Sequence, residues 1–424
     1  MSFSNCSEEN LLYQPKYFTE WRSEVLYGLA KWKNGLAFKK INFSNNGKPV
    51  IKIAELKNGL SAQTKYTRDE FDKSVFLTKG DMVFSWSGNP ETSIDIFWYN
   101  LPDGWLNQHI FKVTVDNGID EKFFYYILKF LKPNFTAIAS NKQTTGLGHV
   151  TIGDLKNIIV KLPELEEQKA IAHILATLDD KIEVNNQINK TLENMAQAIF
   201  KQWFVDFEFP NEDGQPYKSS GGEMVESELG MIPKGWEVKE LGEIIDIHDS
   251  KRIPLSKNER EKREKIYPYY GAASLMDYVD EYIFDGIYVL LGEDGTVVNE
   301  DGSPVLQYVW GKFWVNNHAH VLSGKKGVSI NYLYILLSNL NVSGAITGAV
   351  QLKINQKNLK ELKIIMPNDM KLISQFSDIV DKSFEKIRVK RDESNNLVSL
   401  RDSLLPKLMS GEIRVPLDDE GDES

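Results

Sequence analysis

The chain has 424 residues, of which 42% are hydrophobic and 26% charged, so it is long enough for two or three domains that each bury a core. No run approaches the 18 consecutive apolar residues of a membrane-spanning helix. The single cysteine, Cys6, excludes a disulfide framework and a cysteine-built zinc site. The first ten residues are acidic and polar, unlike a secretory signal, and we therefore expect a cytoplasmic protein.

The net charge of −10 is unevenly distributed. Residues 206–230 hold seven acids and one lysine, and residues 417–424 hold five acids and no base. By contrast, residues 31–68 hold nine Lys and Arg against one acid, and residues 251–265 hold seven against three. Because local basic patches attract phosphate whatever the charge of the whole chain, a nucleic-acid partner stays open.

The two halves of the chain share three short patterns in the same order. We therefore predict an internal duplication, in which each copy is a mixed region of about 130–160 residues followed by a helix of about 40. The matching pairs are WLNQH at 105–109 with WVNNH at 314–318, LKNIIVKLP at 155–163 with LKELKIIMP at 359–367, and LDDKI at 178–182 with SFEKI at 383–387.

Each mixed region combines β-rich runs with short amphipathic stretches. Residues 81–86 and 287–291 are rich in β-branched, aromatic or alternating apolar positions, which predicts strands. Residues 120–131 and 329–340 fit short amphipathic helices. We therefore expect the α/β class for both copies.

Long helices are predicted over residues 164–205 and 369–415, with apolar residues at heptad spacing. Asn185 and Asn189 interrupt the first apolar seam, and polar residues interrupt the second at matching positions. Matched polar positions specify register, so we expect the two helices to pair as an antiparallel coiled coil. The alternative is that each helix packs only on its own domain. The matching polar residues of the second helix are Lys390 and Ser394.

No sequence pattern indicates a catalytic centre. The chain has no GxxxxGKS or GxxxxGKT phosphate loop, no GxSxG elbow and no Asn-Pro-Pro-aromatic motif. His318 and His320 are the only close pair of histidines, and without carboxylates or cysteines at ligand spacing they favour the polar edge of a strand over a metal site. We expect no catalytic residue, metal or cofactor in this chain.

Basic and amide side chains are the best candidates for binding, with DNA phosphates and base edges as their ligands. Lysines supply the charge in the first half, and a loop near residue 140 supplies amides. In the second half, a basic, turn-rich run supplies the charge, and tyrosines follow it. The alternative for each residue is an ordinary solvated side chain. The candidates are Lys39, Lys40, Lys48, Lys52, Lys57, Asn141, Lys142, Gln143, Thr144, Lys251, Arg252, Lys257, Arg260, Tyr269 and Tyr270.

Several motifs resemble those of the specificity (target-recognition) subunit of type I restriction-modification systems. They are WFVDF at 203–207, ELGMIPKGW at 228–236, YPYYGA at 267–272 and LLPKLMSGEI at 404–413. The resemblance covers nearly the whole chain. The entry to the first domain, residues 20–26, departs from the pattern, because it lacks the Ile-Pro-x-Gly sequence that precedes the second domain.

This resemblance implies two α/β target-recognition domains, each reading one half of a bipartite, non-palindromic DNA target. Paired helices would set the spacer, since about 40 residues make a rod of roughly 60 Å, longer than one ~34 Å duplex turn. The implied segments are 1–163 (first recognition domain), 164–205 (first spacer helix), 206–234 (acidic linker, expected to be a flexible tether), 235–368 (second recognition domain), 369–415 (second spacer helix) and 416–424 (acidic tail).

The resemblance also implies that catalysis belongs to partner subunits. Two methyltransferase subunits would bring S-adenosylmethionine for adenine methylation, and motor-nuclease subunits would bring ATP and Mg. Phe200, Phe204, Leu400 and Leu405 are candidates for the methyltransferase interface, with a place in the core as the alternative. Two other functions stay open: the recognition subunit of a related two-subunit methyltransferase-nuclease, and a two-headed coiled-coil scaffold that binds proteins.

Overall fold

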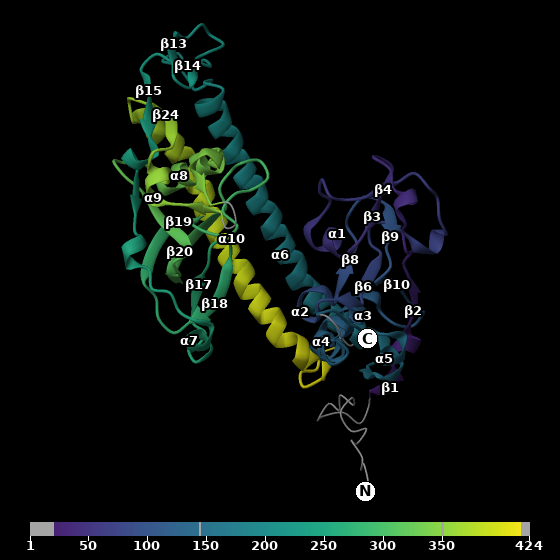
Figure 1. The fold of residues 1–424 in the computed structure, drawn as a ribbon. Coiled ribbons are helices and arrows are strands. Elements are labelled where there is room, and N and C mark those ends of the chain that lie inside the picture. The colour runs from purple at the N-terminus through teal and green to yellow at the C-terminus, as the bar shows by residue number, and fades with distance from the viewer. Residues whose placement is uncertain (1–20, 144–145, 349–351, 417–424) are drawn as a thin grey trace, which may run out of the picture. The chain divides into compact units, whose positions relative to one another are not determined.

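The structure is a computed structural model that describes residues 21–143, 146–348 and 352–416. By their internal contacts, the described residues before residue 184 and after residue 394 form unit 1, and those of 184–394 form unit 2. Both units include part of each long helix, α6 (Leu165–Phe200) and α10 (Lys371–Met409) (Figure 1). Among the described residues, no helix combines the length and the apolar composition needed to cross a membrane.

Unit 1 begins with short strands and short helices, as its β-rich and amphipathic patterns predict. Its strands are β1 (Arg22–Val25), β2 (Ala30–Asn34), β3 (Lys48–Ile51), β4 (Tyr66–Thr67), β5 (Phe76–Leu77), β6 (Met82–Ser85), β7 (Ser87–Gly88), β8 (Asp95–Trp98), β9 (Gly104–Leu106), β10 (Ile110–Val115), β11 (Gly148–His149) and β12 (Ile159–Leu162). Its helices before α6 are α1 (Ile53–Asn58), α2 (Pro90–Ser93), α3 (Glu121–Phe130), α4 (Lys132–Asn141) and α5 (Ile152–Asn157).

Unit 2 has a similar succession of elements. Its strands are β13 (Met224–Ser227), β14 (Gly230–Pro233), β15 (Trp236–Glu240), β16 (Ile245–Ile247), β17 (Tyr267–Tyr270), β18 (Leu275–Val279), β19 (Phe284–Gly292), β20 (Leu306–Val315), β21 (Ala319–Gly324), β22 (Ile346–Thr347), β23 (Lys353–Ile354) and β24 (Lys363–Pro367). Its helices before α10 are α7 (Lys257–Glu261), α8 (Ile330–Ser338) and α9 (Gln356–Lys360).

The central sheets of the two units share the order of four strands. The four-stranded sheet of unit 1 has the order β2-β10-β6-β8, and the six-stranded sheet of unit 2 has the order β16-β21-β19-β20-β17-β18. The four strands of unit 1 and the first four of unit 2 pair antiparallel throughout. One parallel pair also recurs: Val50 of β3 faces Trp105 of β9, and Tyr269 of β17 faces Trp314 of β20. The predicted duplication and the α/β class are therefore confirmed.

Backbone hydrogen bonds place the repeated Trp-x-Asn-x-His pattern at equivalent positions in the two folds. The amide N–H of Asn107 donates to the carbonyl of Ile51 in unit 1, and that of Asn316 donates to Tyr270 in unit 2, both at 3.0 Å. The repeated LKxxxxxxP pattern ends in β12 and β24, which pair antiparallel with β1 and β15 respectively. The short sequence matches thus mark equivalent structure.

Helices α3 and α8 occupy the same place in the two folds, and both start at a side-chain cap. Asp120 accepts a hydrogen bond from the amide N–H of Phe123 at 2.8 Å, and Ser329 accepts one from Tyr332 at 3.1 Å. Such caps satisfy N–H groups that the first helical turn leaves unpaired. The apolar faces of both helices belong to the buried core of their unit.

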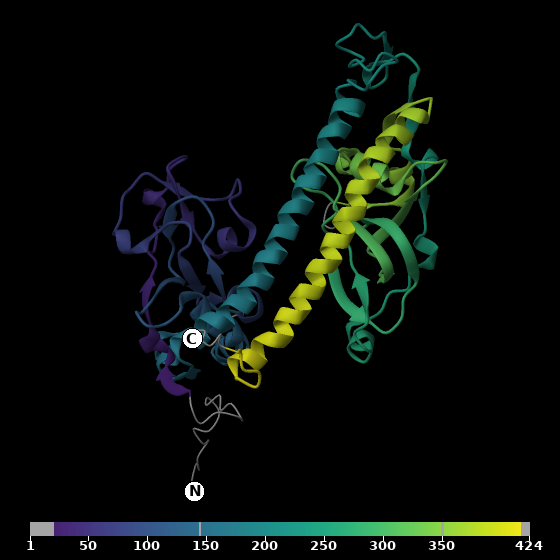
Figure 2. The same ribbon diagram turned by 180° about the vertical axis from the view of Figure 1, so that it is seen from behind.

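Helices α6 and α10 run antiparallel within each unit (Figure 2). In unit 1, Arg401 of α10 donates to Asp179 of α6 at 2.6 Å. In unit 2, Asn185 of α6 donates to Ser394 of α10 at 3.3 Å, and both side chains are buried. The predicted helix pairing is therefore confirmed, and a polar contact lies in its apolar seam as expected.

The acidic segment after α6 is folded, so the prediction of a flexible tether is wrong. Strands β13 and β14 form an antiparallel hairpin. The ring of Phe209 stacks on Tyr217 at 4.6 Å and on Trp236 at 5.3 Å. The amide N–H of Ser219 donates to the carboxylate of Glu208 at 3.0 Å. Aromatic residues placed among the acids give this segment a packing surface that its net charge does not reveal.

Candidate nucleic-acid interface

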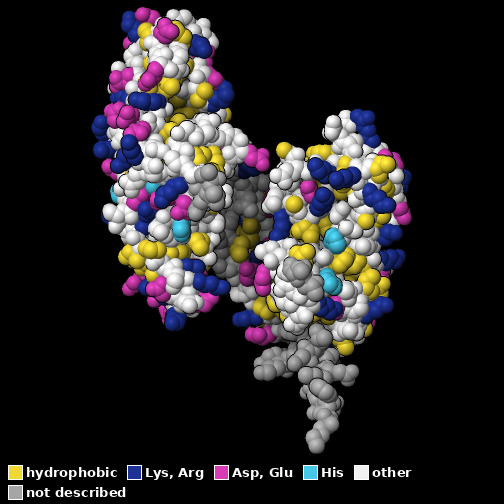
Figure 3. Space-filling view, in the orientation of Figure 1, with side chains coloured by type: hydrophobic (Ala, Val, Ile, Leu, Met, Phe, Trp, Pro, Cys, Tyr) yellow, Lys and Arg dark blue, Asp and Glu magenta, His cyan; other side chains and the backbone are white. Residues whose placement is uncertain are grey.

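In unit 1, lysine candidates lie around a short 3-10 turn, Lys40–Asn42. Lys40 in this turn and Lys39, which precedes it, are both exposed. The ammonium of Lys52 lies 5.8 Å from the ring of Phe43, directly after the turn. Lys and Arg side chains gather over α1, β3 and β4 on this face of unit 1 (Figure 3). The fold therefore concentrates the predicted positive charge on one part of the surface.

The remaining lysine candidates of unit 1 have partners within the unit. Lys48 forms an ion pair with Glu70 at 3.1 Å and lies 4.4 Å above the ring of Phe76. Lys57 donates a hydrogen bond to the carbonyl oxygen of Thr92. Lys48 retains 40% exposure of its side chain, so its charge reaches the surface in spite of the pairing.

The predicted amide-bearing loop begins where α4 ends. Asn141 and Gln143 are exposed, whereas Lys142 pairs with Asp154. Burial alone would raise the pKa of the Asp154 carboxyl, but hydrogen bonds from Lys142 and Thr151 outweigh burial and hold the pKa below its ordinary value. Thr144 lies outside the described residues.

Two arginine candidates of unit 2 have structural roles. Arg252 is only 11% exposed and donates to Glu293 at 2.7 Å and to the carbonyl of Ala319 at 2.6 Å. Arg260 is 12% exposed and donates to Asp277 at 3.2 Å. Their charges are neutralised inside the unit, so the structure contradicts the expectation that these two arginines are free to contact DNA.

The tyrosine candidates are buried to different degrees. Tyr269 is 1% exposed, and its hydroxyl accepts a hydrogen bond from the amide of Leu255 at 2.9 Å. Tyr270 is half-buried and packs edge-to-face on Phe313 at 5.9 Å. Tyr269 is therefore a core residue and does not present a surface to DNA.

The lysines of the same run are on the surface. Lys251 is exposed, and Lys257 has 81% of its side chain exposed with Glu261 at 3.7 Å. Of the four basic candidates in residues 251–260, the two lysines are therefore the ones that remain exposed and able to contact DNA phosphates.

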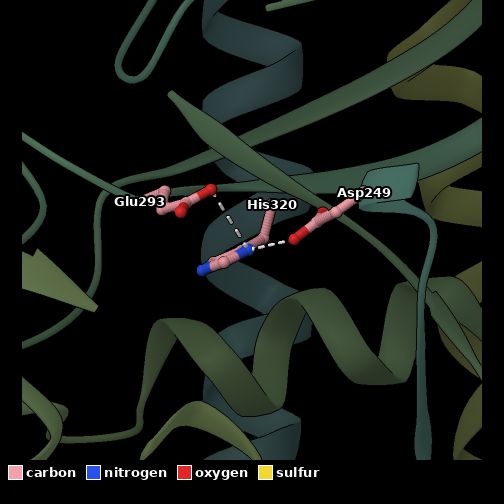
Figure 4. A group of neighbouring side chains, drawn as sticks. All are labelled: Asp249, Glu293 and His320. Atoms are coloured by element: carbon pink, nitrogen blue, oxygen red, sulfur yellow. Dashed lines mark hydrogen bonds and ion pairs between the residues drawn. The ribbon is translucent and has the colours of Figure 1, made fainter. Parts of the chain in front are cut away.

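Asp249, Glu293 and His320 form a buried cluster in unit 2 whose carboxylate and imidazole atoms lie within 4.8 Å of one another (Figure 4). His320 is fully buried. Its Nδ1 lies 2.6 Å from Asp249 and its Nε2 lies 2.8 Å from the carbonyl oxygen of Ile354. Both ring nitrogens therefore face oxygen atoms that can accept a hydrogen bond. The expectation that this histidine marks the polar edge of a strand is therefore wrong.

The cluster is better suited to ion pairing than to a metal. Nη1 of Arg252 bonds to Glu293, and its Nη2 lies 3.3 Å from Asp249. Burial alone would raise the pKa of both carboxyls, but His320 and Arg252 outweigh burial and hold each pKa below its ordinary value. A cation would have to displace the guanidinium and compete for imidazole nitrogens that already have hydrogen-bond partners.

The equivalent position of unit 1 is aromatic. The amide of Trp86 donates to the carbonyl of His109 at 3.1 Å, as Glu293 does to His318 at 2.8 Å in unit 2. The indole of Trp86 stacks on Phe111 at 5.6 Å. Because one copy has ion pairs where the other has stacked rings, this position stabilises each fold and is not a chemical centre common to both.

The four candidates for a partner interface also divide into buried and exposed side chains. Phe200 and Phe204 are 2% and 6% exposed and pack on Phe376 at 5.8 and 5.2 Å, so they are core residues of unit 2 and inaccessible to a partner. Leu405 is partly buried against the core of unit 1. Leu400 is 46% exposed on α10 and is the one of these four side chains most accessible to a partner.

The described residues form a duplicated α/β fold with exposed lysines in both copies, which suits proteins that bind an extended anionic polymer. The model of the type I restriction modification DNA specificity domain matches residues 19–194 and 233–396. The chain therefore belongs to this family, whose members are DNA target-recognition components.

Comparisons with individual proteins agree with this assignment. The chain is 28% identical over 330 residues to the type I restriction enzyme MjaIX specificity subunit of Methanocaldococcus jannaschii, covering 73% of each chain. It is 25% identical over 414 residues to the MjaVIII specificity subunit of the same organism, covering 88% of this chain and 91% of the relative.

A solved structure has the same fold. It is the S subunit of a type I restriction-modification system from M. genitalium, with a TM-score of 0.55 and 18% identity. The match covers 93% of this chain and 98% of the S subunit.

Proposed function

We propose that this chain is the non-catalytic sequence-specificity subunit of a type I restriction-modification complex. Unit 1 and unit 2 each read one half of a bipartite, non-palindromic DNA target. The observation that carries the proposal is the repetition of one strand order with different side chains on its loops. Two copies of one scaffold with different surfaces suit two different half-sites.

Exposed lysines supply the contacts with phosphates that position each unit on the duplex. In unit 1 these are Lys39 and Lys40, and in unit 2 they are Lys251 and Lys257, all of them on the surface. Amide side chains near Asn141 are suited to base edges, because an amide both donates and accepts hydrogen bonds.

The paired helices set the gap between the half-sites. Helix α6 has 36 residues, a length of about 54 Å at 1.5 Å per residue, which exceeds the ~34 Å of one duplex turn. The buried contact between Asn185 and Ser394 supports a single register of the pair, since a shifted register would leave these polar groups against apolar ones.

Partner subunits perform the chemistry. Two methyltransferase subunits dock on the helices and bring S-adenosylmethionine. Motor-nuclease subunits join through them and bring ATP and Mg. Exposed apolar side chains on the helices support docking: Met195 is 54%, Val389 58% and Leu400 46% exposed. Adenine methylation within a duplex requires the base to leave the stack, and the pocket that receives it belongs to the methyltransferase.

An exchange of one recognition domain tests this division of labour. Residues 236–367, from β15 to β24, are replaced by the corresponding residues of a related specificity subunit, and the methylated target is sequenced. The proposal predicts that one half of the target changes while the other half and the gap persist. A change of both halves, or of neither, contradicts it.

A further inference from the structure

The most exposed large apolar side chain of the described residues is Ile41, in the turn that carries Lys39 and Lys40. It is 88% exposed, whereas the next most exposed, Val389, is 58%. A single exposed apolar residue is common on protein surfaces. This one stands in a short turn, between the exposed Lys40 and the partly buried Asn42.

The turn is held in place from several sides. The amide of Lys39 donates to Oδ1 of Asn42 at 3.0 Å, and Nδ2 of Asn42 donates to Asp69 at 3.1 Å. The ring of Phe38, which precedes the turn, packs edge-to-face on Phe71 at 5.1 Å. Because its base is anchored, the turn presents Ile41 to solvent in a defined position at little cost in conformational entropy.

Unit 2 has a comparable residue in the corresponding loop, between β16 and β17. Ile253 is 52% exposed and follows Lys251 and Arg252. Its carbonyl oxygen accepts a hydrogen bond from the indole N–H of Trp314 at 2.6 Å, which anchors the backbone at this point. The two units thus share an anchored loop with an exposed isoleucine after two basic residues, although their loop lengths differ.

We propose that Ile41 reads a base in the half-site of unit 1 by apolar contact with the 5-methyl group of thymine, while Lys39 and Lys40 neutralise the neighbouring phosphates. Thymine presents the only methyl group on the base-pair edges of the major groove, and an aliphatic side chain is the usual complement to it. Charge complementarity between the flanking lysines and DNA selects a duplex as the occupant of this surface. The inference rests on the proposed function and extends it to one specificity-determining residue.

The test is a double-mutant cycle between protein and DNA. The chain and its methyltransferase subunit are first used to select the target. Binding is then measured for wild type and Ile41→Ala on that duplex, and on duplexes with deoxyuridine replacing thymidine at one position of the half-site, which removes only the methyl group. Val25→Ala, a truncation of another exposed aliphatic residue of unit 1 at 42% exposure, is the matched control.

We expect Ile41→Ala to weaken binding about 5- to 10-fold. Deoxyuridine at one position should weaken wild-type binding by a similar factor and add no loss to Ile41→Ala, because both changes remove one contact. Val25→Ala should bind like wild type. The melting temperature of Ile41→Ala should not change, since the side chain is exposed.

Additive losses, an unchanged affinity of Ile41→Ala, or a unit 1 half-site without any A·T pair overturn the inference and leave the proposed function intact. Failure of the wild-type complex to select any bipartite target is a different result, and it overturns the proposed function itself.

Discussion

Replacement of Arg252 distinguishes a structural ion pair from a DNA contact. Arg252→Met keeps most of the aliphatic stem and removes the guanidinium between two buried carboxylates, Asp249 and Glu293. Loss of one partner of a buried ion pair costs about 3–5 kcal/mol. We expect the lower end, about 3 kcal/mol, because Lys353 remains 3.2 Å from Glu293 and His320 remains 2.6 Å from Asp249.

Thermal and urea unfolding of the variant measure this cost. Unit 2 spans residues 184–394, and for a domain of this size a loss of about 3 kcal/mol lowers the melting temperature by roughly 6–12 °C. Lys251→Ala is the matched control. Lys251 precedes Arg252 and is exposed, so its loss should change stability by less than about 0.5 kcal/mol.

The effect should depend on pH in a defined direction. Both carboxyls have a pKa below the ordinary value in the folded chain, so their stabilising contribution is present above the unfolded-state pKa of about 4 and is lost as pH falls through the lower folded values. The stability difference between wild type and Arg252→Met should therefore shrink below about pH 4. If Arg252→Met leaves the melting temperature unchanged and makes DNA binding weaker and less dependent on salt, the structural role of Arg252 is refuted.

Three further variants test other parts of the account. Asn185→Leu should stabilise the helix pair by about 1 kcal/mol, because a buried polar residue in such a seam gives register at a cost in stability; a lower melting temperature would contradict this. Lys39→Ala with Lys40→Ala should weaken binding to all duplexes and reduce the salt slope by about 2, whereas an unchanged slope would remove these lysines from the interface. Glu167→Gln should cost about 2–3 kcal/mol in urea unfolding, since Glu167 is buried and accepts two hydrogen bonds from Arg414 at 2.6 and 3.0 Å; a loss below about 0.5 kcal/mol would contradict it.

The duplication and the helix pair could be predicted because their signals are local. Trp105 and Trp314 lie within five-residue patterns that the fold places on equivalent strands. The apolar seam of α6 repeats at heptad spacing, and its polar interruption at Asn185 meets a polar residue of α10. By contrast, the acidic segment was predicted from charge alone, and its stacked rings at Phe209 are a packing property that charge does not reveal.

The candidate site was harder to predict because pairing partners are distant in sequence. Arg252 bonds to Glu293, 41 residues away, and Arg260 bonds to Asp277, 17 residues away. A local count of charges treats all four residues as surface residues. Ile41 was missed for a related reason: an isoleucine is expected in the core, and only the fold shows it to be 88% exposed.

Selection from a randomised duplex library tests the central claim most directly. The chain is purified with its methyltransferase subunit, and bound duplexes are recovered and sequenced at a stated salt concentration, because the affinity for phosphates depends on salt. The account predicts enrichment of two different short blocks separated by a constant gap. A well-formed complex that enriches no sequence would contradict it and favour a scaffold that binds proteins.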